Sequence, residues 1–168
     1  MKKLLILLFS ILISLNSYGE TETDYYENGQ IEQEGNYKDG KVDGKYTRWN
    51  ENGQKLEEGN YKDGNFDGKL TAWYENGQIK AEGNYKDGEQ EGKSTYWYEN
   101  GQIKSEVTVK DDKEDGKFTE WHENGQKESE GTFKDGKLDG KVTLWYENGQ
   151  IRGEANFKDG ECISGDCD

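Results

Sequence analysis

The tetrapeptide Glu-Asn-Gly-Gln recurs six times in this chain, and its spacing constrains the fold more than any other feature. The copies lie at residues 27–30, 51–54, 75–78, 99–102, 123–126 and 147–150, each starting 24 residues after the last without insertion or deletion. A fixed period of this length is typical of repeat proteins, in which each repeat is one supersecondary unit. Residues that recur with the period are therefore expected to hold the repeats together rather than to catalyse a reaction.

The first 19 residues have the pattern of a secretory signal peptide. Two lysines precede an apolar run over 4–15, and Ser17 and Gly19 are small residues at the −3 and −1 positions of a cleavage site. The run of 12 residues is short for a spanning helix, which needs roughly 20. An uncleaved N-terminal anchor is the alternative. We therefore expect export, to the medium, the periplasm or the cell surface.

The charge of the chain is strongly acidic. Removing 1–19 takes away two lysines and no acidic residue, which changes the net charge from −14 to −16. Nucleic-acid phosphates and anionic lipid head groups repel such a chain, so we expect it to bind neither nucleic acid nor an anionic membrane directly. Only 29% of the residues are hydrophobic, but the aromatic residues keep register over the repeats, which argues against disorder.

Two turn signals divide each repeat into two extended segments. Asn-Gly, as in Asn28-Gly29, is a strong hairpin signal and predicts a tight turn. The second connection contains two glycines, such as Gly40 and Gly44, and predicts a longer turn of about five residues. The segments between them are rich in Thr, Tyr and Trp and have no helical spacing, which indicates strands. We expect twelve, one of them partial, in an all-β, elongated, single-layer antiparallel meander of six 24-residue hairpin repeats.

Alternation within the strands predicts two different faces. One parity of the first strand carries an unbroken carboxylate column that is expected to face solvent, at Glu34, Glu58, Glu82, Glu106, Glu130 and Glu154. The other parity carries small residues and, two positions later, mostly aromatic ones, and is expected to face the packed side. All five tryptophans share one site of the second strand: Trp49, Trp73, Trp97, Trp121 and Trp145. Because tryptophan can cover the exposed backbone of glycine, we expect the tryptophan, glycine and Tyr/Phe columns to share one face.

The ends of the chain differ from the repeats. We divide it into the signal peptide 1–19, a lead-in 20–24, the repeat array 25–160 and a C-terminal tail 161–168. The tail holds both cysteines, Cys162 and Cys167. An oxidising compartment favours a local disulfide between them, and a free thiol pair or an intermolecular bridge are the alternatives.

No residues form a convincing catalytic or metal-binding pattern. His122 stands where other repeats have tyrosine, and neither cysteine is a plausible partner for it. The fourth repeat has Val107 and Val109 in place of Gly and Tyr, and the charged segment 110–115 in place of the usual turn. Its acidic residues, like Asp39 and Asp43, could attract Ca²⁺, but their spacing matches no known calcium loop, and turn chemistry explains them. We expect no enzyme activity, no metal and no cofactor.

The segment from Glu34 to Gly44, Glu-Gly-Asn-Tyr-Lys-Asp-Gly-Lys-Val-Asp-Gly, resembles the bacterial variant of the MORN repeat. That family's unit is a hairpin around Gly-x-aromatic-x-(Asp/Asn)-Gly-x-x-x-Gly, and the resemblance covers about residues 25–160 in five or six copies. It implies an elongated antiparallel sheet that acts as an interaction scaffold. Some members are thought to contact membranes, and bacterial variants often carry an antitoxin label. The resemblance supplies no catalytic residues.

Three functions are compatible with these features. The first is an exported bacterial scaffold that binds an unknown protein or cell-surface component, as a monomer. The second is binding of cell-wall glycans or choline by the tryptophan ladder, because aromatic faces can stack on sugars or enclose quaternary amines. The third is an antitoxin or immunity-type protein that binds a toxin, a role that presumes a cytoplasmic protein and conflicts with the signal peptide.

Overall fold

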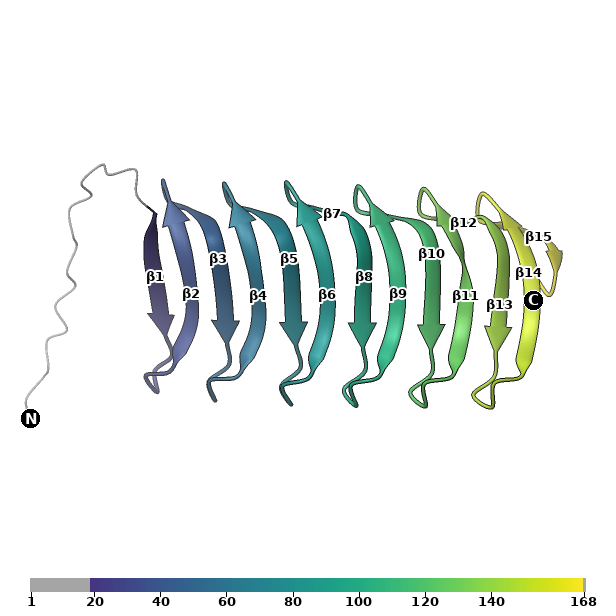
Figure 1. Ribbon diagram of the computed structural model, residues 1–168, viewed down its shortest axis with the longest axis horizontal. Coiled ribbons are helices and arrows are strands. Elements are labelled where there is room, and N and C mark those ends of the chain that lie inside the picture. Colours follow the sequence, from purple (N-terminus) through teal and green to yellow (C-terminus); the bar gives the residue numbers. More distant parts are fainter. Residues whose placement is uncertain (1–18, 168) are drawn as a thin grey trace, which may run out of the picture.

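The computed structural model describes residues 19–167 and shows one open antiparallel sheet. Its 15 strands follow one another in chain order, and no helix occurs among the described residues (Figure 1). The predicted all-β, single-layer meander of hairpin repeats is therefore confirmed. All but Gly19 of the predicted signal peptide lies outside the described residues.

Most strands have six to nine residues, whereas β7 and β12 have only two each. They are β1 Glu20–Tyr25, β2 Ile31–Lys38, β3 Lys41–Trp49, β4 Lys55–Lys62, β5 Asn65–Trp73, β6 Ile79–Lys86, β7 Glu89–Gln90, β8 Gly92–Trp97, β9 Ile103–Lys110, β10 Lys113–Trp121, β11 Lys127–Lys134, β12 Lys137–Leu138, β13 Gly140–Trp145, β14 Ile151–Lys158 and β15 Glu161–Gly165.

The number of strands exceeds the expected twelve for two reasons. The short strands β7 and β12 pair only with β6 and β11, and a single residue, Glu91 or Asp139, separates each from the strand that continues it. In addition, the sheet extends past 25–160 at both ends. β1 includes the predicted lead-in 20–24, and β15 is formed by the predicted C-terminal tail.

The tight turns occur at Asp-Gly and not at Asn-Gly, opposite to the sequence prediction. Lys38 pairs with Lys41, so Asp39 and Gly40 alone connect β2 to β3, with φ of 50° and 75°. Positive φ at both central residues defines the hairpin turn whose twist matches the strands. The second glycine, Gly44, has φ of 118° and lies inside β3, where the register shifts. It forms a bulge that takes up the residues expected in a longer turn.

The Asn-Gly connection is a five-residue loop. In the first loop, Tyr26 to Gln30, the Tyr26 N–H donates to the Gln30 carbonyl and the Gly29 N–H donates to the Tyr26 carbonyl, both at 2.9 Å. Gly29 has a positive φ of 84°, whereas Asn28 does not. Asn28 instead accepts the Gln30 N–H on its side-chain oxygen at 2.9 Å. In Figure 1 these loops follow the lower edge of the sheet, and the Asp-Gly turns follow the upper edge.

The turn of the fourth repeat keeps the shape of the others although it lacks glycine. Asp111 and Asp112 have φ of 49° and 59°, and Lys110 pairs with Lys113 as in the other turns. Asp112 thus adopts a left-handed conformation that costs a non-glycine residue energy. Its Oδ1 accepts the Gln90 N–H at 2.6 Å, which offsets part of that cost.

The register places the glycine column and the glutamate column on opposite faces. Gly59 lies opposite Tyr46 and Leu70, and Glu58 lies opposite Thr47 and Thr71. Directly opposed residues of an antiparallel sheet share a face. We call the side with Gly35, Gly59, Gly83, Val107, Gly131 and Ala155 the glycine face, and the side with the Glu34 column the carboxylate face.

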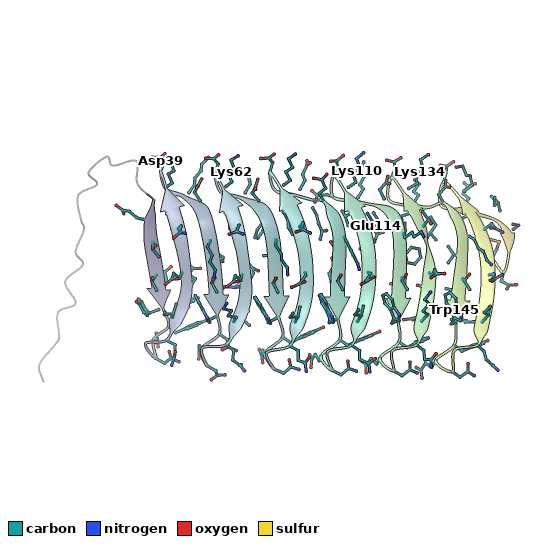
Figure 2. The ribbon with its side chains drawn as sticks, viewed as in Figure 1. Asp39, Lys62, Lys110, Glu114, Lys134 and Trp145 are labelled. Atoms are coloured by element: carbon teal, nitrogen blue, oxygen red, sulfur yellow. A yellow bond between two sulfur atoms is a disulfide. The ribbon has the colours of Figure 1, made fainter. Side chains whose placement is uncertain are left out.

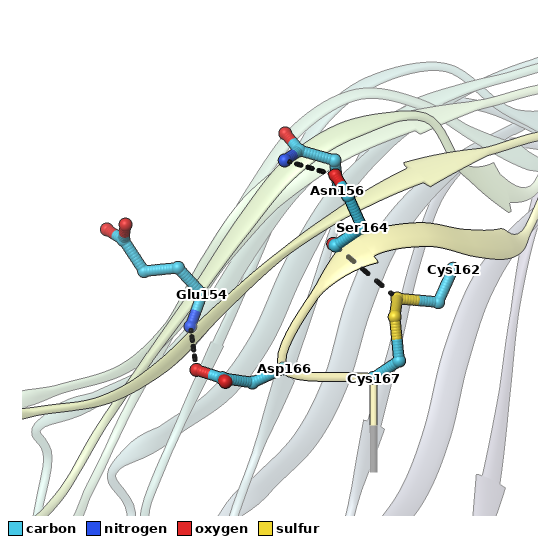
Figure 3. Close-up of a disulfide and its surroundings, with 6 residues drawn as sticks. All are labelled: Glu154, Asn156, Cys162, Ser164, Asp166 and Cys167. Atoms are coloured by element: carbon cyan, nitrogen blue, oxygen red, sulfur yellow. Dashed lines mark hydrogen bonds between the residues drawn. A yellow bond between two sulfur atoms is a disulfide. The ribbon is translucent and has the colours of Figure 1, made fainter.

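At the C-terminal edge of the sheet, a disulfide closes a short loop of the tail. Cys162 in β15 is bonded to Cys167, five residues later (Figure 3). Asp166 turns back onto β14, where its N–H donates to the Glu154 carbonyl at 2.8 Å and its Oδ2 accepts the Glu154 N–H at 3.2 Å. The Asn156 Nδ2 donates to the Ser164 hydroxyl at 3.1 Å. These contacts cover part of the edge that β14 would otherwise expose.

Candidate interaction faces

The tryptophan ladder lies on the carboxylate face, which corrects the expectation that it shares a face with glycine. The residues opposite the glycines stand three positions before each tryptophan, and an odd separation along a strand reverses the face. Lys55 shows the placement directly, because its Nζ lies 2.6 Å from Glu58 Oε2 and 5.7 Å from the ring centroid of Trp73. All five tryptophans are half-buried at the ends of β3, β5, β8, β10 and β13.

Lysines of the protein itself lie over some of these rings. Lys55 covers Trp73, and Lys127 lies 5.5 Å from the ring centroid of Trp145. A sugar or quaternary amine would have to displace these ammonium groups from the ring face. Figure 2 shows Trp145 toward the edge of the Asn-Gly loops, and Lys62, Lys110 and Lys134 along the opposite edge.

Most glutamates of the carboxylate face are paired with lysine while their side chains stay partly exposed. A row of cross-strand ion pairs joins Lys45 to Glu58 at 3.0 Å, and Lys69 to Glu82, Lys93 to Glu106 and Lys141 to Glu154 at 2.6 Å. Hydrogen bonds from Lys55 and then Lys45 lower the pKa of Glu58 below its ordinary value. Because the groups are exposed, each pair contributes little stability by itself.

The Asn-Gly loops bind one another along the array. The hydroxyls of Tyr26, Tyr74 and Tyr98 each donate at 2.7 Å to the carbonyl of the tryptophan in the next repeat. His122 takes the same place, with its Nε2 at 3.1 Å from the Trp145 carbonyl. The loop asparagines make a parallel set of bonds to the glutamate carbonyl of the next loop, from Asn28, Asn76, Asn100 and Asn124. Repeated loop residues therefore hold neighbouring repeats together, and His122 does so as well.

An aromatic stack covers the first half of the glycine face. Tyr46, Tyr61, Phe66 and Tyr85 follow one another with ring centroids 5.5, 4.3 and 5.2 Å apart. Burial of the phenol raises the pKa of Tyr61 to about 12. The glycines make room for this layer, because a Cβ on Gly35 would lie 3.0 Å from the Tyr37 ring and 3.1 Å from the Tyr46 ring. The packed layer of this thin protein is on this face.

The stack is interrupted in the fourth repeat, and a hollow of about 540 Å³ opens there. Val109 stands where the other repeats have tyrosine or phenylalanine, and Gln90 and Glu114 stand where most other repeats have an apolar residue. The stack resumes at Phe118 and Phe133, whose ring centroids lie 4.7 Å apart. The lining is Gln90, Tyr96, Ser105, Glu106, Val107, Val109, Asp112, Glu114, Phe118, Glu120, Ser129, Phe133, Leu138, Val142 and Leu144. It contains no lysine or arginine.

The sequence pointed to the fourth repeat but missed the residues that make the hollow. Val107 lies opposite Ser94 and Phe118, and the fully buried Ser94 replaces the larger Tyr46 and Leu70 of the earlier repeats. A larger residue in the glycine column is thus matched by a smaller one beside it. The departure of Ser94, Gln90 and Glu114 from their columns was visible in the sequence. Only the structure shows that Gln90 donates a hydrogen bond to Ser94 and lines the same hollow as Glu114.

Two further observations concern cations and membranes. No group of three or more His, Cys, Asp or Glu residues within 19–167 is arranged to hold a metal ion, the acidic turn of the fourth repeat included. In the same part of the chain, no helix is long and apolar enough to cross a membrane.

The family model of the MORN repeat variant matches six consecutive segments, 21–39, 42–63, 66–87, 90–111, 114–135 and 138–159. Each segment contains two strands and the Glu-Asn-Gly-Gln loop that joins them. The chain therefore belongs to the MORN repeat variant family, as its sequence resemblance predicted. No curated protein gives a significant match to the chain. Within the described residues, β15 follows the last matched segment, and it contains Cys162 of the disulfide.

Proposed function

We propose that this chain is an exported, non-catalytic scaffold that binds a protein or another component of the cell surface. The proposal rests on one observation: the repeated polar residues bond neighbouring repeats and strands to one another. The loop tyrosines and asparagines bind the next repeat, and the glutamates bind lysines of neighbouring strands. Residues engaged in this way build a long surface, which is what repeat proteins use to bind partners.

Export is supported by the two ends of the chain. Residues 1–19 have the order of a signal peptide, and Cys162 and Cys167 form the kind of local disulfide that persists in oxidising compartments. The acidic charge favours a basic partner over nucleic acid or an anionic lipid surface.

Cell fractionation combined with affinity capture tests the proposal. The full chain, tagged at its C-terminus and expressed in its own organism, is expected in an extracytoplasmic fraction, with a specific partner that an unrelated exported protein does not retain. Location in the cytoplasm would contradict export and favour the antitoxin alternative. Capture of nothing above background from every surface fraction would contradict the scaffold.

The tryptophan ladder provides a separate test of glycan or choline binding. Since all five tryptophans are half-buried, and Lys55 and Lys127 lie over Trp73 and Trp145, we expect no shift of tryptophan emission when cell-wall fragments or choline are added. A saturable shift would contradict the proposal and favour the glycan-binding function.

A further inference from the structure

The hollow in the glycine face combines an apolar floor with unpaired acidic groups. Val107, Val109, Phe118 and Phe133 contribute apolar surface to the floor, and Leu144, which is 37% exposed, lies at its margin. Its volume of about 540 Å³ is in the range of sites that hold a small ligand or a few side chains. A site of this composition binds apolar groups through burial and fixes their orientation through its few polar groups.

Four acidic residues line the hollow, and one of them, Glu106, is paired with Lys93. The other three, Asp112, Glu114 and Glu120, belong to no ion pair within the described part of the chain. Glu120 accepts a hydrogen bond from the Ser129 hydroxyl at 2.6 Å, and Asp112 accepts the Gln90 N–H. The glutamates of the carboxylate face, in contrast, have lysine partners in most repeats. The negative charge at the hollow is therefore available to a partner.

Resting on the scaffold function proposed above, we propose that the hollow binds a basic peptide segment of a partner protein. One bulky apolar side chain enters between Val109, Phe118 and Phe133, and flanking lysine or arginine side chains pair with Glu114 and Glu120. Charge complementarity selects this occupant, because the lining offers carboxylates and no base. An acidic segment would be repelled by these carboxylates. A purely polar segment would leave the apolar floor without an apolar partner.

Fluorescence anisotropy with three synthetic peptides tests the proposal on the mature chain with its disulfide intact. The first peptide has a central Arg-Phe-Lys-Leu-Lys core, the second has glutamate in place of each basic residue, and the third has serine in place of Phe and Leu. We expect the first to bind at least about tenfold more tightly than either of the others, and its binding to weaken with added salt.

Two variants locate the binding. The double variant Glu114→Gln, Glu120→Gln should weaken the first peptide about tenfold, whereas the control Glu123→Gln, Glu147→Gln, which removes the same charge from the Asn-Gly loops, should not. Val109→Tyr restores the aromatic residue of the other repeats and should abolish binding by filling the hollow, with the melting temperature retained. If Val109→Tyr does not fold, the glutamine variants still decide the question.

Specific results would overturn the proposal. They are equal binding of the basic and acidic peptides, equal loss in the loop control, or binding that survives Val109→Tyr. Equally tight binding of a free phenylalkyl ammonium ion would show that the hollow binds a small cation instead of a peptide. If the native partner is still captured by Val109→Tyr, the hollow is not the site but the scaffold function stands, so the two failures are distinguishable.

Discussion

At the scale of single residues, the glycine column determines how closely the aromatic layer lies on the sheet. A Cβ at Gly131 would be 2.7 Å from Phe118 Cε1 and 2.9 Å from Val142 Cγ2. The next repeat has Ala155 at the same position, 6% exposed, opposite Val142 and the short strand β15. The column therefore tolerates a methyl group only where a neighbouring side chain leaves room.

Gly131→Ala should lower the free energy of unfolding by about 1–3 kcal/mol, because the two side chains must shift. Urea denaturation followed by circular dichroism measures the change. Ala155→Gly is the matched control in the same column and should cost only about 0.5–1 kcal/mol through backbone entropy. An unchanged stability for Gly131→Ala would show that the layer is looser than the distances indicate.

The half-buried phenol of Tyr61 should make stability depend on pH in the alkaline range. Its pKa is raised to about 12 in the folded state by burial, so the folded state favours the neutral phenol. This contribution is fully present below the unfolded pKa of about 10 and is lost as the pH rises through about 12. Wild type should therefore lose stability above pH about 10 more steeply than Tyr61→Phe. Denaturant titrations across this range measure it, with Tyr146→Phe, at a 52% exposed site, as the control. Parallel curves for wild type and Tyr61→Phe would contradict the burial.

At the scale of elements, each Asn-Gly loop is hydrogen-bonded to the next repeat except at one junction, between the second and third loops. Asn50 takes the place of the tyrosine, and its side chain accepts the N–H groups of Asn52 and Gln54 in its own loop. As a result, among the described residues no tyrosine hydroxyl bonds the Trp73 carbonyl, and Asn52 does not bond the next loop. The junction between the second and third loops is the weakest along this edge.

Asn50→Tyr should stabilise the array by about 1 kcal/mol, because it restores the hydroxyl bond and frees Asn52 for its usual role. Tyr98→Phe removes the equivalent hydroxyl from an intact junction and should cost about 1 kcal/mol. Thermal unfolding monitored by calorimetry compares both with wild type. Destabilisation by Asn50→Tyr would show that the loop of the second repeat requires its own asparagine.

At the scale of the whole molecule, each strand pairs only with its neighbours in the sheet, so we expect the ends to open without the middle. At the C-terminal end, β15 pairs with β14, and the disulfide closes a short loop from Cys162 in β15 to Cys167. The N-terminal edge strand β1 is instead protected by acidic residues, which discourage pairing with another chain. The sheet thus avoids edge-to-edge association differently at its two ends.

Replacing Cys162 and Cys167 by serine should cost about 2 kcal/mol, the entropy of closing a short loop. The loss should be local. Hydrogen exchange followed by mass spectrometry should show faster exchange in β14 and β15, while strands β2 to β6 remain unchanged. Faster exchange throughout the sheet would contradict the nearest-neighbour description of the array.

The sequence was sufficient to predict the repeat, the meander and the family, because period and motif fix them together. It assigned the tight turn to the wrong dipeptide, since Asn28-Gly29 and Asp39-Gly40 both tolerate positive φ and only the bulge at Gly44 distinguishes them. The prediction that the tryptophans share a face with the glycines was also wrong, because the residue opposite each glycine depends on strand register. The hollow could not be predicted, since it depends on the register that places Val109 opposite Glu114 and Val107 opposite Ser94 and Phe118.

Site-directed photo-crosslinking in the native organism tests the central claim, that the scaffold binds its partner on the glycine face at the fourth and fifth repeats. One chain carries the photoreactive residue at Leu144 beside the hollow, and another carries it at Lys69 on the carboxylate face. The account predicts a discrete crosslinked species from Leu144 that disappears with Val109→Tyr, and none from Lys69. Crosslinking from Lys69 alone, or from Leu144 regardless of Val109→Tyr, would contradict it.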